Sequence, residues 1–356
     1  MMVRSIAIGM SIFYTSKEQL AKRFERPYGL QNETLAEFPA WKERLRRQLV
    51  EITGLDTMER CTPNPRVVET VKCDGYTRQK MLIETEPSVT MPFYVLIPDA
   101  HQPEKKSPAF LALHGHCGGG KVAVAGVGDD PRVAEQIKIF NYEYAVRLVR
   151  LGLLVFVPDA RGFGERREEL HQGDEHLTVS SCSELNRIAI SLGQSVAGMW
   201  TWDNMRLTDY ISSRDDVDPT RIGIGGLSGG GLQTLWAAAL DDRYRCAAIS
   251  GYFYGFQNSL FDFFCCSCNY VPQLFRTADM GDLAALIAPR PLFIETGKQD
   301  WLNGTRGMPN VLEQLEITRK AYALFDAKKN LVHDAFEDGH KWHGKYSEPW
   351  IIEQLK

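Results

Sequence analysis

The sequence predicts an α/β fold in which a mostly parallel sheet carries helices on both faces. From about residue 142 onward, short apolar runs typical of buried parallel strands alternate with helix-like runs. One such strand, which starts at Ile222, leads through Gly226-Leu-Ser-Gly-Gly230 into a helix-like run that begins at Leu232. A serine between glycines at a strand-to-helix junction is typical of a nucleophile elbow.

The composition is that of an ordinary globular protein and argues against several classes of function. The chain has 356 residues, of which 44% are hydrophobic and 24% are charged, and its net charge is −4. No block of basic residues is present, so we expect neither nucleic acid nor an anionic membrane as a partner. No apolar run is long enough to span a bilayer.

The N-terminus and the cysteines bear on where the protein works. Residues 1–10 contain a short apolar run but no clear small-x-small cleavage site, so we expect a cytoplasmic protein, with a weak signal peptide left open. The eight cysteines are better interpreted as reduced thiols than as the disulfide framework of a small secreted domain. Within them, Cys265-Cys266-Ser267-Cys268 is predicted to be a packed group of thiols rather than a redox or metal site.

Two parts are expected along the chain, a helical N-terminal extension over residues 1–60 and a catalytic domain over residues 61–356. The extension carries apolar residues at helical spacing from Glu33 to Val50, with Pro39 interrupting an early turn. It is expected to act as a cap or as an oligomer contact, so a homo-oligomer is left open. Residues 67–98 then alternate with a period of two and predict an antiparallel meander at the sheet edge.

The elements after the meander follow in a regular order. Strands are predicted at residues 108–114, 153–159, 222–227, 246–250, 291–296 and 331–336, and helices at residues 142–152, 195–214, 232–240 and 310–326. Two segments break this order, the charged, loop-like residues 161–192 and the aromatic, irregular residues 252–277. Both are predicted to be insertions that cover the crevice at the carboxyl ends of the strands.

Ser228, at the centre of the elbow, needs a base and an orienting acid, because a free hydroxyl is a weak nucleophile. In the chain order typical of this elbow, both partners lie on loops after later strands. Asp300 follows the strand that ends at Thr296, and His340 follows the last strand. We predict that Ser228 attacks, His340 moves the proton and Asp300 orients the imidazole. His343 is the rival base.

Other titratable residues near these two loops are expected to stay outside the chemistry. Glu295 lies inside its strand and is expected to point away from the crevice. Glu337 and Asp338 lie too close to His340 along the chain to reach round it. His333 lies in the body of the last strand, where a satisfied core histidine is the usual outcome.

Two backbone N–H groups are expected to stabilise the developing oxyanion. One belongs to Gly229, the residue after the serine, and the other to the loop His114-Gly-His-Cys-Gly-Gly-Gly120. In that loop His116 is the expected donor, with Cys117 next in line. The side chain of His114 is expected to brace the loop rather than to take part in catalysis.

The same loop matches a phosphate loop and a metal site only in part. Residues 115–122 nearly spell G-x-x-x-x-G-K-[ST], but Val122 replaces the hydroxyl that would hold Mg²⁺. His114, His116 and Cys117 lack a spaced carboxylate or a second cluster that would complete a zinc site. We therefore expect no metal and no cofactor, and activity that survives chelation.

Taken together, these motifs resemble the α/β-hydrolase superfamily, in particular the bacterial esterases grouped near acetyl xylan esterases and dienelactone-hydrolase-like proteins. The motifs that carry the resemblance, over roughly residues 90–345, are His114-Gly-His116, Asp159-Ala-Arg-Gly-Phe-Gly-Glu-Arg166, Trp202-Asp203-x-x-Arg206, Gly226-x-Ser228-x-Gly230, Cys268-Asn-Tyr-Val-Pro272, Ala288-Pro-Arg-Pro291, Gly297-x-x-Asp300 and Gly339-His340. The resemblance implies an eight-stranded sheet, no cofactor, and ester hydrolysis through an acyl-enzyme. One departure is the segment Trp301-Leu-Asn-Gly304, where relatives often carry a proline-rich turn.

The expected function is that of a serine carboxylesterase acting on small-molecule substrates, the small acyl esters of carbohydrates or similar alcohols. Aromatic residues of the second insertion, Tyr252 among them, are predicted to form a substrate-binding wall together with Trp200 and Trp301. A peptidase or a lactonase on the same triad stays open. A non-catalytic binding protein on this scaffold is the alternative from another class, and the complete triad argues against it.

Overall fold

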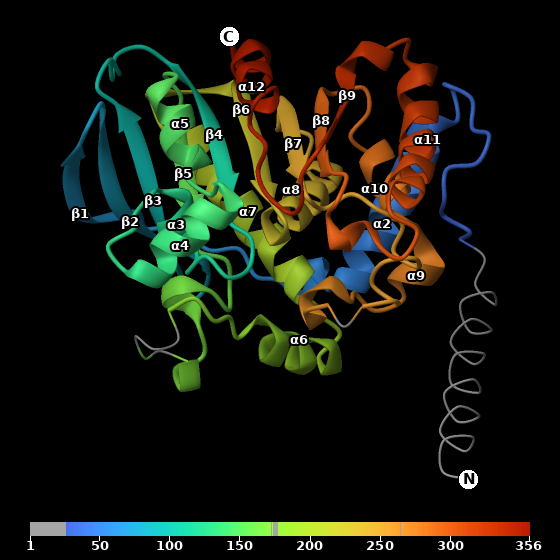
Figure 1. Cartoon of the computed structure of the whole chain (residues 1–356), viewed down its shortest axis with the longest axis horizontal. Helices are drawn as coiled ribbons and strands as arrows, with labels where there is room; N and C mark the ends of the chain where they lie inside the picture. The colour runs from blue at the N-terminus through green and yellow to red at the C-terminus, as the bar shows by residue number, and fades with distance from the viewer. Residues whose placement is uncertain (1–25, 172, 174–176, 264) are drawn as a thin grey trace.

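The computed structural model describes residues 26–171, 173, 177–263 and 265–356. Within them, nine strands form one sheet in the order β1-β2-β3-β5-β4-β6-β7-β8-β9 (Figure 1). The pairings up to β3–β5 are antiparallel, and all the later pairings are parallel. The mostly parallel sheet of an α/β-hydrolase is therefore confirmed, although the resemblance implied eight strands and the sheet has nine.

The predicted meander forms the antiparallel edge of this sheet. Its strands are β1 (Arg66–Cys73), β2 (Tyr76–Glu86) and β3 (Val89–Pro98). The turn between β1 and β2 is tight because Gly75 adopts a φ of 82°, which a residue without a Cβ reaches at little cost. The strand β1 is exposed along most of its length and pairs only with β2, so it extends the edge by one strand without enlarging the core.

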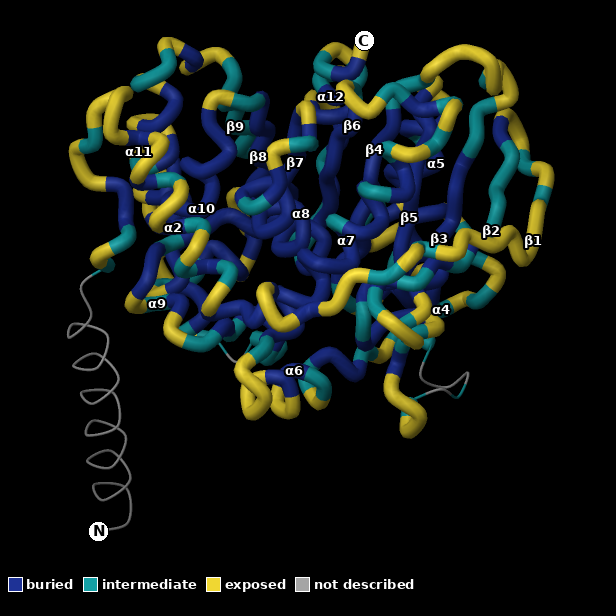
Figure 2. The backbone as a smooth tube through the Cα atoms, turned by 180° about the vertical axis from the view of Figure 1, so that it is seen from behind, coloured by how far each residue is buried: buried dark blue, intermediate teal, exposed yellow. Residues whose placement is uncertain are grey.

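The six parallel strands all lie where the apolar runs predicted them. They are β4 (Ser107–Leu113), β5 (Leu154–Pro158), β6 (Val217–Leu227), β7 (Cys246–Ser250), β8 (Leu292–Gly297) and β9 (Leu331–Phe336). Figure 2 shows the central strands, β5, β4, β6, β7 and β8, largely in the colour of buried residues, whereas β9 lies at the edge of the sheet and is mostly half-buried. Because the carboxyl ends of the six parallel strands meet at one edge of the sheet, the loops that follow them converge there.

Helices cover both faces of the sheet, as two separate core clusters show. One cluster joins the sheet to α2 (Phe38–Thr53), α7 (Val196–Ser213), α8 (Gly229–Leu240), α10 (Met280–Ala285) and α11 (Met308–Leu324). The other joins it to α3 (Lys121–Val124), α4 (Pro131–Phe140), α5 (Tyr144–Arg150) and α12 (Ser347–Leu355). Among the described residues, no helix is long and apolar enough to cross a bilayer.

The four helices predicted beside the sheet are present as α5, α7, α8 and α11, whereas α4, α10 and α12 were not predicted. The described part of the first insertion contains a helix that was not predicted. Residues 161–192 end in α6 (Cys182–Ser191), which packs against α7 and against the short 3₁₀ turn Ser267–Asn269 of the second insertion. The second insertion is irregular as predicted, apart from that turn and α9 (Leu274–Thr277).

The described part of the N-terminal extension packs directly on the catalytic body. Trp41, Leu45 and Leu49 of α2 are buried in the same cluster as α7 and α8. Pro39 lies in the first turn of α2, where its missing N–H costs no helical hydrogen bond, so it begins the helix rather than interrupting one. Residues 1–25, on which the signal-peptide alternative depends, lie outside the described residues, and the boundary at residue 60 stays a prediction.

Candidate active site

Ser228 lies at the sharp turn between β6 and α8. Its φ of 60° is in the left-handed region, which a residue with a Cβ rarely adopts. The flanking glycines allow this turn to press against the end of β4. A Cβ on Gly226 or Gly230 would lie 2.2 or 1.9 Å from the carbonyl oxygen of Leu113. The backbone N–H of Ser228 donates to the carbonyl of Ser250, at 2.9 Å, and holds the turn against β7.

The two predicted partners of Ser228 contact each other. Asp300 follows β8 and His340 follows β9, and the imidazole Nδ1 lies 2.6 Å from the carboxylate Oδ2. The other carboxylate oxygen accepts the N–H of Leu302 at 2.9 Å, so the acid is held from both sides. The loops can meet because Gly297 has no Cβ, which would lie 2.2 Å from the carbonyl oxygen of Gly339.

Ser228 and His340 line one cavity of about 290 Å³. Gly251, directly after β7, lets the imidazole lie close to the elbow. A Cβ at this position would lie 3.0 Å from both the Cε1 of His340 and the Cδ1 of Leu227. The structure thus brings the predicted nucleophile, base and acid to the carboxyl ends of β6, β9 and β8.

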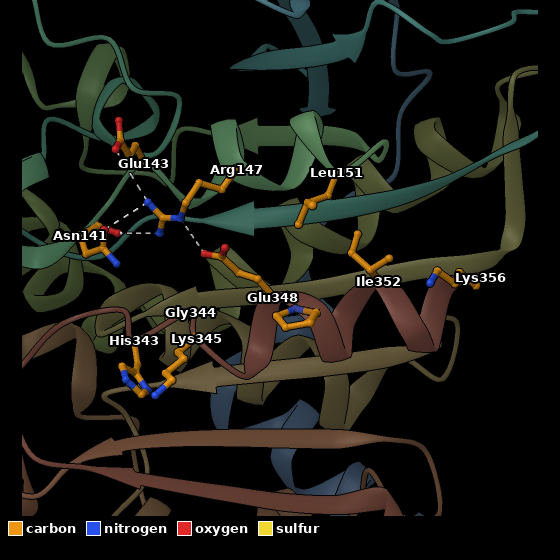
Figure 3. A pocket seen from close by; sticks show the side chains of 11 residues that line it. Asn141, Glu143, Arg147, Leu151, His343, Gly344, Lys345, Glu348, Ile352 and Lys356 are labelled. Atoms are coloured by element: carbon orange, nitrogen blue, oxygen red, sulfur yellow. Dashed lines mark hydrogen bonds and ion pairs between the residues drawn. The ribbon is translucent and has the colours of Figure 1, made fainter.

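The rival base His343 lies elsewhere. Its Nδ1 is 2.5 Å from the Oδ2 of Asp334, and its ring stacks on Phe336 with centroids 4.4 Å apart. It lines a larger hollow of about 720 Å³ between α5 and α12. Figure 3 shows it below the ion pair of Arg147 with Glu348. That hollow does not include Ser228, so its size does not make it the better candidate for the chemistry.

The other residues that were expected to stay outside the chemistry are satisfied locally. Glu295 accepts the N–H groups of His343 and Gly344 at 3.1 and 2.9 Å and the hydroxyl of Ser347 at 2.5 Å, so it faces away from the crevice as predicted. His333 contacts the hydroxyl of Thr296 at 3.1 Å. Partial burial lowers the pKa of His333 to about 4, which keeps the imidazole neutral. The side chain is half-buried on the edge strand β9, so it is satisfied as predicted but does not lie in the core.

The loop after β4 is braced by the side chain of His114. Its Nδ1 lies 2.9 Å from the carbonyl oxygen of Gly115, and its Nε2 accepts the N–H of Ala160 at 3.0 Å. These contacts place the ring proton on Nδ1, and burial lowers the pKa of the imidazole. The bracing role predicted for His114 is confirmed. Because a trans peptide points its C=O and N–H in opposite directions, the N–H of His116 faces away from His114.

The two predicted oxyanion donors lie beside each other. Gly229 opens α8 and lines the cavity together with His116. The imidazole of His116 covers Gly229 so closely that a Cβ there would lie 2.9 Å from the imidazole Nδ1. The hydroxyl of Tyr142 donates to the carbonyl of His116 at 2.8 Å and fixes that side of the loop.

The lysine of the near-phosphate loop is committed to an internal ion pair. The Nζ of Lys121 lies 2.6 Å from the Oδ2 of Asp159 and also contacts Glu165. The backbone N–H of Lys121 donates to the Oδ1 of Asp159 at 2.7 Å. Although burial favours the neutral amine, these two carboxylates raise the pKa of Lys121. Lys121 therefore ties the β4 loop to the β5 loop and does not face a phosphate site.

A second buried ion network holds the start of the first insertion. The Oδ1 and Oδ2 atoms of Asp203 accept hydrogen bonds from Arg161 at 2.9 and 3.0 Å, and Oδ2 also accepts one from Arg166 at 2.7 Å. Burial would raise the pKa of Asp203, but the two guanidinium groups outweigh it and hold the pKa well below its usual range. These residues, which carried part of the resemblance, position the loop after β5 rather than line the cavity.

The aromatic wall of the cavity differs in part from the prediction. Tyr252 and Trp301 line the cavity. Trp200 does not, because α7 places it beneath the loops. It is 1% exposed, donates its indole N–H to the carbonyl of Arg161 at 2.9 Å, and packs against Phe163. We therefore remove Trp200 from the substrate-binding set.

Several wall residues were missed by sequence reasoning. Cys117, the alternative oxyanion donor, and Tyr254, an aromatic residue of the second insertion, also line the cavity. The lining residues that were not predicted are Phe140, Tyr142, Cys265, Cys266, Asn269 and Leu302. Phe140 ends α4, a helix that begins at an Asp130 cap followed by Pro131 and carries apolar residues at helical spacing. Those start signals could have predicted the helix, although not that its end reaches the active site.

Cysteines from both insertions gather round His116. The imidazole Nε2 and the sulfurs of Cys182, Cys266 and Cys268 all lie within 4.8 Å of one another, and we refer to these four residues as the His116 sulfur cluster. The sequence offered no second cluster for His116, because Cys182 belongs to α6 of the first insertion and the other two cysteines to the second. The structure supplies one.

Comparisons with known proteins show the family to which the chain belongs. A model of the Abhydrolase family matches residues 14–254, more than half of the chain. The chain belongs to this family. A protein of Bacillus subtilis (strain 168), described as "Putative hydrolase YtaP", is 29% identical over 76% of this chain and 85% of its own length.

Solved structures show the same fold. A protein of Bacteroides fragilis described as "a putative acetyl xylan esterase" superposes with a TM-score of 0.77 at 22% identity, covering 91% of this chain and 82% of that one. A glucuronoyl esterase of Solibacter usitatus superposes with a TM-score of 0.64 at 13% identity, covering 93% of this chain and 98% of that one. At these identities the similarity establishes the α/β-hydrolase fold, and the substrate has to be inferred from the site.

Proposed function

We propose that the protein is a serine carboxylesterase that hydrolyses small acyl esters, such as acetyl esters of carbohydrates or similar alcohols. The observation that carries the proposal is the 2.6 Å contact between His340 Nδ1 and Asp300 Oδ2, with His340 and the elbow residue Ser228 lining one cavity. A serine at a strained turn, a histidine and a buried carboxylate are the three groups that acyl transfer to a hydroxyl requires.

In the proposed mechanism, the hydroxyl of Ser228 attacks the ester carbonyl while the Nε2 of His340 takes its proton. Asp300 accepts a hydrogen bond from the Nδ1–H of His340, which keeps the second ring proton on Nδ1 and stabilises the imidazolium. The backbone N–H groups of Gly229 and His116 stabilise the oxyanion. The imidazolium then returns its proton to the leaving alcohol, and water activated by the same imidazole releases the acid from the acyl-enzyme.

The size and lining of the cavity support small substrates. Its volume of about 290 Å³ is at the lower end of ligand pockets, and Phe140, Tyr142, Tyr254 and Trp301 contribute to an aromatic lining. Trp301 is 56% exposed and packs edge-on against Phe263, so it stands at the open rim. This arrangement suits a short acyl chain inside and a sugar-like or aromatic alcohol against Trp301.

The similar structures that are described as an acetyl xylan esterase and a glucuronoyl esterase support an ester as the substrate. A lactonase or a peptidase would use the same three residues.

We also propose that the protein works in the cytoplasm and that it has no nucleic-acid or membrane partner. Whether it forms a homo-oligomer is a question for a measurement of its mass in solution.

A substrate screen tests the proposal directly. Initial rates are measured with p-nitrophenyl esters of increasing acyl length, acetylated sugars, lactones and aminoacyl amides, with the Ser228→Ala variant as the background. We expect the highest kcat/KM with acetyl or similarly short esters, and negligible turnover of amides. Faster turnover of lactones or amides than of any open-chain ester would replace the carboxylesterase with one of the two alternatives.

A further inference from the structure

We propose that the His116 sulfur cluster is a binding site for a single Zn²⁺ ion, with His116 Nε2 and the thiolates of Cys182, Cys266 and Cys268 as four tetrahedral ligands. This site stands independently of the proposed esterase activity, because none of its four side chains carries a role in the triad. It also departs from the sequence-based expectation that no metal is bound.

The distances within the cluster match one small tetrahedral ion. Zinc–sulfur bonds of about 2.3 Å and zinc–nitrogen bonds of about 2.0–2.1 Å give nitrogen–sulfur edges of about 3.6 Å and sulfur–sulfur edges of about 3.8 Å in a regular tetrahedron. The Nε2 of His116 lies 3.6 Å from the sulfur of Cys182 and 3.4 Å from that of Cys268. The sulfurs of Cys182 and Cys266 are 3.0 Å apart and need to separate slightly.

The ligand types point to zinc rather than to a hard cation. Three thiolates and an imidazole form a soft set that is typical of structural zinc sites, whereas Mg²⁺ and Ca²⁺ prefer oxygen ligands. All four ligand atoms lie within 4.8 Å of one another, which suits one ion with its coordination closed by protein. Cys182 and Cys268 have no exposed surface, so water has little access to their side of the site.

Polar groups surround the sulfurs in the way that thiolate ligands require. The hydroxyl of Ser183 lies 3.1 Å from the sulfur of Cys266, and the hydroxyl of Ser180 lies 3.3 Å from that of Cys182. The side-chain amide of Asn269 donates toward the sulfur of Cys268 at 3.7 Å. Such donors spread the negative charge of metal-bound thiolates and orient the ligands.

Zinc at this position would join three separate segments beside the active site. His116 belongs to the loop after β4, Cys182 to α6 of the first insertion, and Cys266 and Cys268 to the second insertion. Ligation at Nε2 would also leave the proton of His116 on Nδ1, the nitrogen that faces Gly229. The ion would thereby position the oxyanion loop and both insertions while leaving the chemistry to Ser228.

The test is the metal content of the full-length protein after reconstitution with Zn²⁺ under reducing conditions and gel filtration. We expect about one zinc per chain in the wild type. Cys182→Ser and Cys268→Ser should each lose most of this zinc. The matched control is Cys265→Ser, because Cys265 is a neighbour of Cys266 that is absent from the cluster, and this variant should keep its zinc. Ser228→Ala should also keep its zinc, which separates this proposal from the esterase proposal.

Cobalt substitution gives a readout that does not depend on the variants folding. Co²⁺ in a site of three sulfurs and one nitrogen should show thiolate-to-metal charge-transfer bands and the intense visible bands of tetrahedral cobalt. A wild-type protein that binds no zinc, a Cys182→Ser variant that binds as much as the wild type, or an octahedral cobalt spectrum would overturn the proposal. So would a Cys182–Cys266 disulfide in the isolated protein whose reduction does not allow zinc to bind.

Discussion

At the scale of single residues, the site depends on which of two similar histidines faces the elbow. His340 and His343 lie three positions apart and each contacts a carboxylate, Asp300 or Asp334. Only His340 shares a cavity with Ser228. Position after a strand predicted the choice, and the structure adds the reason why His343 is unavailable, since its ring is stacked on Phe336.

The nucleophile gives the first prediction. A serine-directed fluorophosphonate should label Ser228 alone, because the elbow exposes this hydroxyl to the cavity beside His340. Ser228→Ala should lose nearly all turnover while retaining the unfolding transition of the wild type. Peptide mass spectrometry locates the adduct, and an adduct on another serine would contradict the assignment.

The paired histidine variants give the second prediction. His340→Ala should lower kcat by about 10³-fold or more, as loss of a triad member does. His343→Ala should cost little turnover, because it removes a contact to Asp334 away from the cavity. Steady-state kinetics on both variants, with circular dichroism to verify folding, checks the ranking, and the opposite order would assign the base to His343.

The paired acid variants give the third prediction. Asp300→Asn should be nearly as damaging as His340→Ala, because the amide would hold the imidazole in the tautomer whose proton faces Ser228. Glu295→Gln is the matched control, since this buried carboxyl faces His343, Gly344 and Ser347 and not the cavity. Equal losses of kcat in the two variants, both folded, would show that Asp300 has no special role.

At the scale of elements, the site is built by close contacts between strand ends that only glycine permits. The elbow presses on β4 at Leu113, and the β8 loop presses on the β9 loop at Gly339. The second insertion contributes Cys265, Cys266 and Asn269 to one side of the cavity. The site therefore depends on the tight packing of these strand ends.

Glycine substitution tests this contact and gives the fourth prediction. Gly230→Ala would place a Cβ 1.9 Å from the Leu113 carbonyl oxygen, so β4 and the elbow must separate. We expect a loss of about 3 kcal/mol or more in the free energy of unfolding, together with a loss of turnover. Gly128→Ala is the control, because its Cβ would meet the Cβ of Ala134 at an ordinary 3.5 Å. Urea denaturation of both variants checks the difference, and similar losses would mean that the elbow yields easily.

At the scale of the whole molecule, the pH dependence of stability should include a contribution from the half-buried His333. The pKa of this side chain is lowered from 6.5 to about 4 by burial, with a further contribution from Arg319. Between these values the unfolded chain binds more protons than the native protein, so stability rises with pH from 4 to 6.5 and the full contribution is present above that range. The gain amounts to about 1–3 kcal/mol.

The measurement is the free energy of unfolding across this pH range for the wild type and for His333→Gln, which keeps a polar partner for Thr296. We expect the variant to lose the His333 part of the pH dependence, so its stability should fall less than that of the wild type between pH 6.5 and pH 4. Parallel curves for the two proteins would contradict the assignment of this proton uptake to His333.

The sequence alone predicts the fold class, the positions of the parallel strands along the chain and the three residues that we propose as the triad. Each of these depends on local information, namely apolar periodicity, glycine spacing and position after a strand. The bracing role of His114 and the orientation of Glu295 away from the crevice followed from the same local reasoning. Both are present in the structure.

Which side chains reach the cavity depends on the packing of the whole chain. It buried Trp200, brought Phe140 and Tyr142 to the wall, and joined Cys182 to the cysteines of the other insertion round His116. The physical reason is that these contacts join segments that lie tens of residues apart in the sequence. The sequences of these segments show little helical or strand periodicity of their own. The packing of insertions on a sheet depends on shape complementarity across the whole core, which no local spacing of residue types contains.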